Sequence, residues 1–318
     1  MTARHLLKRA VSLLVTLLVA SVGIFGLLRL VPGSTAAAVA GPDATPAQIA
    51  AIDAALGLNR PLPIQYWTWL HGVLTGHLQH SYILNQPIGR LIGHGLGATV
   101  ELTLSAAVIA VVLGLGIGVL AVTSRSRAVR TAANTVTTLA LAVPPYASGT
   151  ALIAVFAVAF PILPSGGHAS LAQDPGIAVQ YLVLPALCLA LPVAAVLARF
   201  LADGLDKALG EDYIRTASSL GVRRRRVIVR HAMPNALAPL ITVAGVQLGN
   251  LLAGSAIVEA LFAWPGLGQL LIQSIISHDL LIVQNLLLFA VTVFVALQLL
   301  SDVARTWLDP RIALGAAS

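Results

Sequence analysis

The sequence predicts an all-α, polytopic membrane protein with six transmembrane helices and both termini in the cytoplasm. Hydrophobic residues make up 58% of the 318 residues and charged residues only 10%, whereas an ordinary soluble domain is about 25% charged. The apolar runs are about 20 residues long, which is the length that a helix needs to cross a bilayer. Helices of this kind satisfy their own backbone hydrogen bonds within lipid.

Six apolar runs define the predicted spans. Pro144-Pro145 predicts a kink in the third span, and Pro185 and Pro192 predict kinks in the fourth. Two series of small residues predict close approach of neighbouring helices. The spans are Ala10–Leu30, Gly97–Val122, Thr135–Phe160, Val179–Phe200, Leu240–Ala260 and Val283–Leu300. The small-residue series are Gly114, Gly116, Gly118 and Gly245, Gly249, Ala253.

The distribution of basic residues predicts the orientation. All of the 19 Lys and Arg residues except Arg29, Arg60 and Arg90 fall on one side of the predicted spans. Because cytoplasmic loops carry an excess of Lys and Arg, that side is the cytoplasm. The same rule accounts for the net charge of +7 without a nucleic-acid partner.

The N-terminal run is interpreted as an uncleaved anchor. Basic residues precede it and Ala38-Val39-Ala40 follows it, as in a signal peptide, but the apolar core of a signal peptide is only about 7–15 residues long. We therefore expect an N-terminal transmembrane anchor over 1–31 and an extracytoplasmic segment over 32–96. A five-helix core over 97–306 contains a cytoplasmic loop over 201–239, and a cytoplasmic tail covers 307–318.

The long cytoplasmic loop predicts a short helix from Glu211 to Gly221. Acidic residues at its start complement the helix dipole, and glycine suits its C-terminal end. Tyr213, Ala217 and Leu220 share one shallow face, and a basic helix follows, up to Pro234, where the chain turns back to the membrane. The residues alone fit two hypotheses: an amphipathic hairpin on anionic lipids or a docking surface for a cytoplasmic partner.

At these residues the chain resembles the inner-membrane subunits of binding-protein-dependent ABC importers. Their loop motif is EAA, three residues, G, nine residues, then I-x-L-P. Its positions fall on Arg215-Thr216-Ala217, Gly221 and His231-Ala232-Met233-Pro234. The departures from the consensus resemble the dipeptide/oligopeptide/nickel permease branch, in which Asp-Tyr-Ile-Arg-Thr-Ala recurs.

Further motifs extend this resemblance over nearly the whole chain. One departure lies at Gly76–Ser81, where the branch has Gly-Asp-Leu-Gly before a serine, so no role is carried over to that turn. The matching segments are Val31-Pro32-Gly33, Leu56–Pro61, Ala98–Leu102, Phe262–Gly268 and Asp309-Pro310-Arg311.

The resemblance implies a type I (MetI-like) importer permease in the bacterial inner membrane. A second homologous permease, two cytoplasmic ABC ATPases and an extracytoplasmic solute-binding protein would be its partners, beside membrane lipid. The substrate would be di- or oligopeptides, moved by alternating access; a nickel, metal-chelate or haem-like solute is the alternative. Docking is then favoured over lipid binding. The implied coupling residues are Asp212, Tyr213, Arg215, Thr216, Ala217, Gly221, His231 and Pro234.

No enzyme activity is expected of this chain. It lacks the G-x-x-x-x-G-K-[ST] run that holds nucleotide phosphates, so ATP and Mg²⁺ would bind the partner ATPases, and this chain would bind no cofactor. No Ser or Cys has an evident paired base, and Cys188 lies in an apolar run. These features disfavour an intramembrane enzyme, and the loop spacing disfavours a scaffold or receptor.

Polar residues within the spans are candidates for a translocation path. Gln247 and Asn250 lie one helical turn apart, whereas Glu101 and Glu259 lie near the predicted outer surface, where solvation would explain them. Hydrogen bonding between helices is the alternative explanation. The candidates are Glu101, Asn134, Gln247, Asn250 and Glu259, with Gln298 as a further polar residue.

The outer segment contains histidines and aromatic residues. His77 and His80 have helical spacing that suits Ni²⁺ or Zn²⁺, but no cysteine or nearby carboxylate completes a site, so no metal site is predicted. Tyr66, Trp67 and Trp69 are expected to anchor the segment at the membrane interface.

Overall fold

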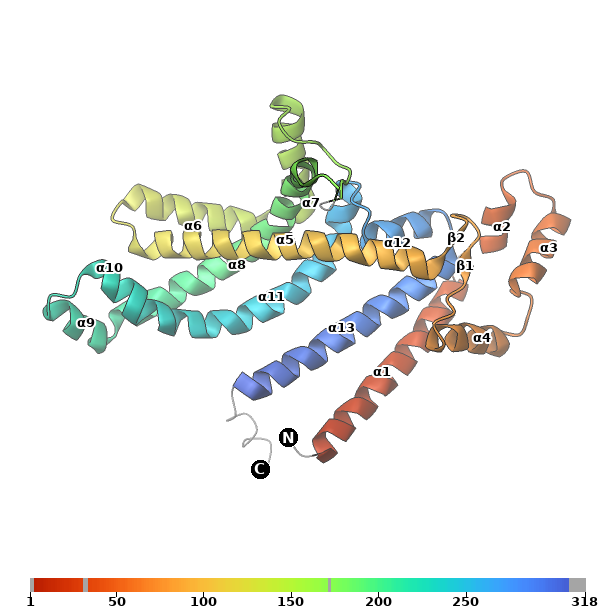
Figure 1. The fold of residues 1–318 in the computed structure, drawn as a ribbon, viewed down its shortest axis with the longest axis horizontal. Helices are drawn as coiled ribbons and strands as arrows, with labels where there is room; N and C mark the ends of the chain where they lie inside the picture. The colour runs from red at the N-terminus through yellow and green to blue at the C-terminus, as the bar shows by residue number, and fades with distance from the viewer. Residues whose placement is uncertain (1–2, 31–33, 171–172, 309–318) are drawn as a thin grey trace. The chain divides into compact units, whose positions relative to one another are not determined.

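A computed structural model describes residues 3–30, 34–170 and 173–308. Within these ranges the regular secondary structure is helical apart from one two-stranded hairpin (Figure 1). It divides into a terminal unit, residues 1–95 with 270–318, and a central unit, residues 96–269. The predicted motifs Val31-Pro32-Gly33 and Asp309-Pro310-Arg311 lie outside the described residues, as does most of the predicted tail.

The terminal unit pairs the first and last long helices. Helix α1 (Ala3–Leu30) packs along α13 (Leu280–Leu308) and touches α4 (Leu62–Leu74) (Figure 1). Two shorter helices, α2 (Thr35–Ala40) and α3 (Pro46–Leu56), precede α4. Thr45 and Gln48 form a capping box at the start of α3, which also has the predicted proline in its first turn.

Aromatic side chains fix α4 on α1. Trp69 is 5% exposed, and its ring lies 6.2 Å from that of Phe25 in a stacked arrangement. Tyr66 meets Phe25 edge to face at 5.4 Å, and its hydroxyl is 2.8 Å from Ser21 Oγ. The predicted interfacial role is therefore wrong for Trp69, whose ring is needed for packing; Trp67 alone of the three is largely exposed.

The segment that departs from the family motif, Gly76–Ser81, ends in the first strand of a hairpin. Strand β1 (His80–Ser81) pairs antiparallel with β2 (Gln86–Pro87). Ser81 is fully buried, and its hydroxyl donates to Asp279 Oδ2 just before α13. The other carboxylate oxygen of Asp279 accepts from the backbone N–H of Ile282 and so caps α13.

Helix α8 (Pro175–Gly210) forms the core of the central unit. It packs against α6 (Arg127–Ala142), α7 (Pro145–Ile153) and α11 (Met233–Leu261). It continues through Pro185 and Pro192, both of which were predicted to kink it.

Glycines on α5 (Ile88–Thr123) allow close approach to α8. A Cβ at Gly114 would lie 2.8 Å from Leu197 Cβ, and one at Gly118 would lie 2.8 Å from the Ala198 carbonyl oxygen. Helix packing at these two residues is confirmed. Gly116 and Gly245 face open space in the described part of the chain, because only the residues on the side of a helix that faces its neighbour are crowded.

Among the described residues, four helices are long and apolar enough to cross a membrane, and their apolar parts cover the first, second, fourth and fifth predicted spans. The sixth predicted span is described in part: α13 is apolar over Leu280–Ala296, and its side chains from residue 297 onward, Gln298 included, lie outside the described residues.

The third predicted span is not one kinked helix. Helix α6 ends at Ala142, and α7 begins at Pro145 and continues as the π-helix η1 (Ala154–Ala159), with a bend of 111° at the break. Pro144 precedes α7 with an extended backbone, and Pro145 occupies its first turn. Two adjacent prolines thus end one helix and start another in a new direction.

Candidate functional site

The predicted cytoplasmic helix is present as α9 (Asp212–Ser219). Its C-terminal end is a Schellman motif, in which Gly221 N–H donates to the Ser218 carbonyl and Val222 N–H donates to the Ala217 carbonyl, at 3.1 and 3.2 Å. Gly221 has a φ of +76°, and a Cβ there would meet nothing within 4 Å. Glycine is therefore required by the left-handed backbone and not by lack of space.

Helix α9 rests on the core of its own chain by one side. Ile214 is 5% exposed within the core cluster around α8, and α9 contacts α8 and the π-helix η2 (Val227–Ala232). The Tyr213 hydroxyl accepts a hydrogen bond from Asn235 Nδ2 on α11 at 2.7 Å. The helix is thus attached both to α8 and to the start of α11.

The other side of α9 is uncovered. Leu220 is 78% exposed and Tyr213 42% exposed. Asp212 and Arg215 are exposed and lie 3.4 Å apart, an arrangement worth little energy in water. Thr216 is also exposed, and its hydroxyl donates to the Asp212 carbonyl. A partner protein placed here would meet an exposed leucine bordered by polar residues.

Tyr213, Ala217 and Leu220 lie on one face of the helix, as predicted, but Ala217 is less exposed than the other two. Ala217 is half-buried against the core cluster. It lies about 40° around the helix from Tyr213 and about 60° from the buried Ile214, so it borders the inner side. Its carbonyl serves the helix end, as described above.

The basic run after α9 continues directly into α11. Arg223 to Arg226 are all exposed, with α10 over Arg224–Arg226, and the chain passes through η2 into α11 without a turn. Pro234 sits in the first turn of α11, where its missing N–H is tolerated, so the predicted turn at this residue is wrong. His231 is half-buried in η2. Arg224 donates to the Thr123 carbonyl at the end of α5, at 3.3 Å.

The polar residues that were proposed for the path have different surroundings. Gln247 is 8% exposed and accepts a hydrogen bond from Asn250 Nδ2, so the predicted shared face is confirmed. Asn134 lies apart on α6, where it lines a shallow hollow with Thr131 and Thr138.

Glu259 is fully buried, so the expectation that it is solvated is wrong. Its Oε1 accepts from the Thr99 hydroxyl at 2.7 Å, and its Oε2 accepts from the backbone N–H groups of Gly268 and Gln269 at 2.7 and 3.3 Å. The carboxylate therefore lies at the N-terminus of α12 (Leu267–Ile276), a position that the helix dipole favours.

The two segments that resemble family motifs meet at this carboxylate. The indole of Trp264 is fully buried and donates to the Ala98 carbonyl at 2.8 Å, and the Thr99 hydroxyl accepts from Leu267 N–H at 2.9 Å. A Cβ at Gly268 would lie 2.2 Å from Ala256 Cα. The sequence motifs Ala98–Leu102 and Phe262–Gly268 thus form a single interlocked site, which their separation in sequence does not reveal.

Glu101 borders the same site. Its Oε2 lies 3.4 Å from His168 Nε2, and the His168 ring meets Trp264 edge to face at 4.6 Å. The side chain is only 20% exposed, so Glu101 is paired and not simply solvated. Among the described residues, no group of three or more His, Cys, Asp or Glu side chains is placed to hold a metal ion.

Comparison with known proteins decides the family. Residues 110–314 match the binding-protein-dependent transport system inner membrane component, and residues 2–87 match the N-terminal model for such membrane components. The chain belongs to this permease family. It is a multi-pass protein of the bacterial inner membrane and a permease subunit of a binding-protein-dependent transporter.

Individual relatives agree with this assignment. A probable peptide ABC transporter permease of Sinorhizobium fredii is 34% identical over 308 residues, which cover 97% of this permease and 98% of the relative. A glutathione transport system permease of Salmonella choleraesuis is 35% identical over 309 residues, with the same coverage. An inward-facing structure of the MetNI methionine ABC transporter covers 67% of this permease and 93% of its own chain, at 22% identity and a TM-score of 0.54, and so shares its fold.

Proposed function

We propose that this permease imports peptides, using ATP that is hydrolysed by two partner ABC ATPases. Relatives that span 98% of their own length in the match are named for peptide and glutathione transport, which supports peptides as the substrate class. A second homologous permease would complete the channel, and an extracytoplasmic binding protein would deliver the substrate.

The observation that carries the coupling proposal is the attachment of α9. An exposed leucine, Leu220, points away from the chain, while Ile214 and Tyr213 join the helix to α8 and α11. Packed interiors transmit displacement because they are dense and weakly compressible. A force from an ATPase on the outer side of α9 would therefore move two long helices of the central unit together.

The exposed side of α9 also suits a protein partner better than a lipid surface. Anionic lipids attract clusters of Lys and Arg, but the exposed part of α9 carries one arginine, Arg215, beside the acid Asp212. The exposed arginines Arg223 to Arg226 come after the helix. We assign lipid contact to that basic run and ATPase docking to α9.

Reconstitution tests the function. The permease, its paired permease and the two ATPases would be placed in proteoliposomes, with the binding protein outside, and uptake of labelled di- and tripeptides measured. We expect uptake only when ATP, Mg²⁺ and the binding protein are all present. ATP-dependent uptake of Ni²⁺ or a metal chelate, with no uptake of any peptide, would contradict the peptide assignment.

A further inference from the structure

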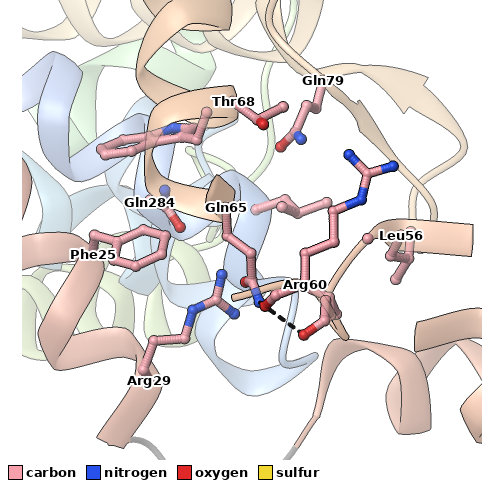
Figure 2. Close-up of a pocket in the computed structure, with 12 residues that line it drawn as sticks. Phe25, Arg29, Leu56, Arg60, Gln65, Thr68, Gln79 and Gln284 are labelled. Carbon is pink, nitrogen blue, oxygen red and sulfur yellow. Dashed lines mark hydrogen bonds between the residues drawn. The ribbon is translucent and has the colours of Figure 1, made fainter. Parts of the chain in front are cut away.

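The terminal unit contains a small pocket lined by two arginines and no acidic residue. It has a volume of about 60 Å³ and is partly open, which is space for about two water molecules or one small polar group. Arg29 comes from the end of α1, and Arg60 comes from the loop between α3 and α4 (Figure 2). Three glutamines and several apolar side chains complete it. The other lining residues are Phe25, Leu56, Gly57, Leu58, Gln65, Thr68, Trp69, Gln79, Leu281 and Gln284.

Local structure builds this pocket from a family motif. Gly57 ends α3 in the left-handed conformation, with a φ of +68°. A Cβ there would contact the Arg60 side chain at 3.6 Å, so Arg60 folds over the glycine. Gln65 Nε2 donates to the carbonyls of Leu58 and Arg60, at 2.8 and 2.7 Å, and holds the loop against α4 (Figure 2).

Two buried polar atoms of lining residues have no partner in the described part of the chain. They are Nε of Arg29, a donor, and Oε1 of Gln65, an acceptor. The Arg29 guanidinium lies over the Phe25 ring, 4.8 Å from its centre, and an unpaired buried group costs about 1–3 kcal/mol. The pocket therefore lacks one acceptor and one donor, next to two positive charges.

We propose that this pocket binds the C-terminal carboxylate of a peptide, together with the adjacent amide N–H. The carboxylate would accept from the arginines, since guanidinium groups match carboxylates in geometry and charge. The neighbouring amide N–H would donate to Gln65 Oε1. Chloride and sulfate supply no such donor, whereas a peptide C-terminus carries both groups unless its last residue is proline. Leu56, Leu58 and Leu281 would contact the last side chain.

The position of the pocket on α1 favours a solute over a lipid headgroup. Phe25 lies on the packed side of α1 and is 7% exposed, whereas Leu27, on the opposite side, is 66% exposed. Membrane lipid would cover Leu27 and the apolar residues near it. The proposal rests on the peptide function above, and it adds a recognition site on the permease itself.

Isothermal titration of the assembled transporter in phosphatidylcholine nanodiscs, without binding protein, tests the site. The probes are trialanine and trialanine amide, which lacks the carboxylate charge. We expect trialanine to bind about 10- to 100-fold more tightly than the amide, as befits charged hydrogen bonds. Arg29→Gln and Arg60→Gln should each remove most of this difference. Arg90→Gln removes an exposed arginine outside the pocket and should leave the affinity difference between the two probes unchanged.

Equal binding of the two probes by the unmodified transporter would overturn the proposal, whatever the variants do. The proposal would also be overturned if Arg90→Gln reduced the affinity difference between the probes as much as the pocket variants do, because that would indicate a general charge effect. The remaining alternative is that the pocket binds a lipid headgroup, and native mass spectrometry of transporter from phosphatidylethanolamine membranes tests it. Retention of phospholipid that depends on Arg29, with no binding of trialanine, would assign the pocket to a headgroup. Binding that depends on Arg29 without any peptide uptake would leave the site standing and refute the transport function.

Discussion

The carboxylate of Glu259 accepts a hydrogen bond from the hydroxyl of Thr99 at 2.7 Å and so ties α11 to α5. Thr99→Val removes this hydroxyl at nearly constant volume and leaves Glu259 Oε1 and Leu267 N–H without their partner. We expect the free energy of unfolding in mixed micelles to fall by about 2–3 kcal/mol. Thr99→Ser keeps the hydroxyl and should cost much less; equal losses in both variants would contradict the role assigned to this bond.

Two glycines of α5 provide a matched pair for helix packing. Gly118→Ala would place a methyl group 2.8 Å from the Ala198 carbonyl oxygen, whereas Gly116 faces open space. We expect Gly118→Ala to lower the free energy of unfolding by about 1–3 kcal/mol and Gly116→Ala to raise it by up to about 1 kcal/mol. Denaturant titration of both variants measures these free energies. Similar changes in the free energy of unfolding for the two variants would show that α5 and α8 are not in close contact.

The hairpin should depend on the bond between Ser81 and Asp279. Ser81→Ala leaves a buried carboxylate oxygen without its donor, and we expect a loss of about 1–3 kcal/mol. Amide hydrogen exchange should quicken over residues 80–87 in this variant. Thr75→Ala, which removes an exposed hydroxyl before the hairpin, is the control; unchanged exchange in Ser81→Ala would mean that the hairpin is held by other contacts.

Much of this structure can be predicted from the sequence, because individual residues determine where several helices lie and where they end. Hydropathy locates α1, α5, α8 and α11 because their apolar runs match the thickness of a bilayer. Gly221 marks the end of α9 because few other residues adopt its backbone conformation.

The predictions that were wrong concern residues whose surroundings are set by tertiary contacts. Pro144-Pro145 indicates a break in the helix. The bend of 111° between α6 and α7, however, depends on the packing of α7 against α8 and α11. Glu259 looks solvated in a linear sequence, because nothing in the sequence brings Thr99 beside it. Trp69 likewise resembles an interfacial residue until Phe25 covers it.

The predicted orientation can be tested with single cysteines, because Cys188 is the only cysteine in the sequence. In a Cys188→Ser background, Ser219→Cys on α9 and Gln48→Cys on α3 are both at exposed positions. We expect a membrane-impermeant maleimide to label Gln48→Cys in intact spheroplasts and Ser219→Cys only after lysis. The reverse pattern would place the basic loops outside.

Coupling of ATP hydrolysis to transport through α9 is tested most directly by Leu220→Glu in the reconstituted transporter. The residue is 78% exposed, so the fold should persist, but a charge would enter the proposed ATPase contact. We predict that peptide uptake and its stimulation of ATP hydrolysis fall at least about 10-fold, since burying an unpaired charge costs more than about 1.4 kcal/mol. Ala128→Glu, at an exposed position in the first turn of α6, should retain both activities. An assembled Leu220→Glu transporter with normal uptake and normal stimulation would contradict the docking of α9.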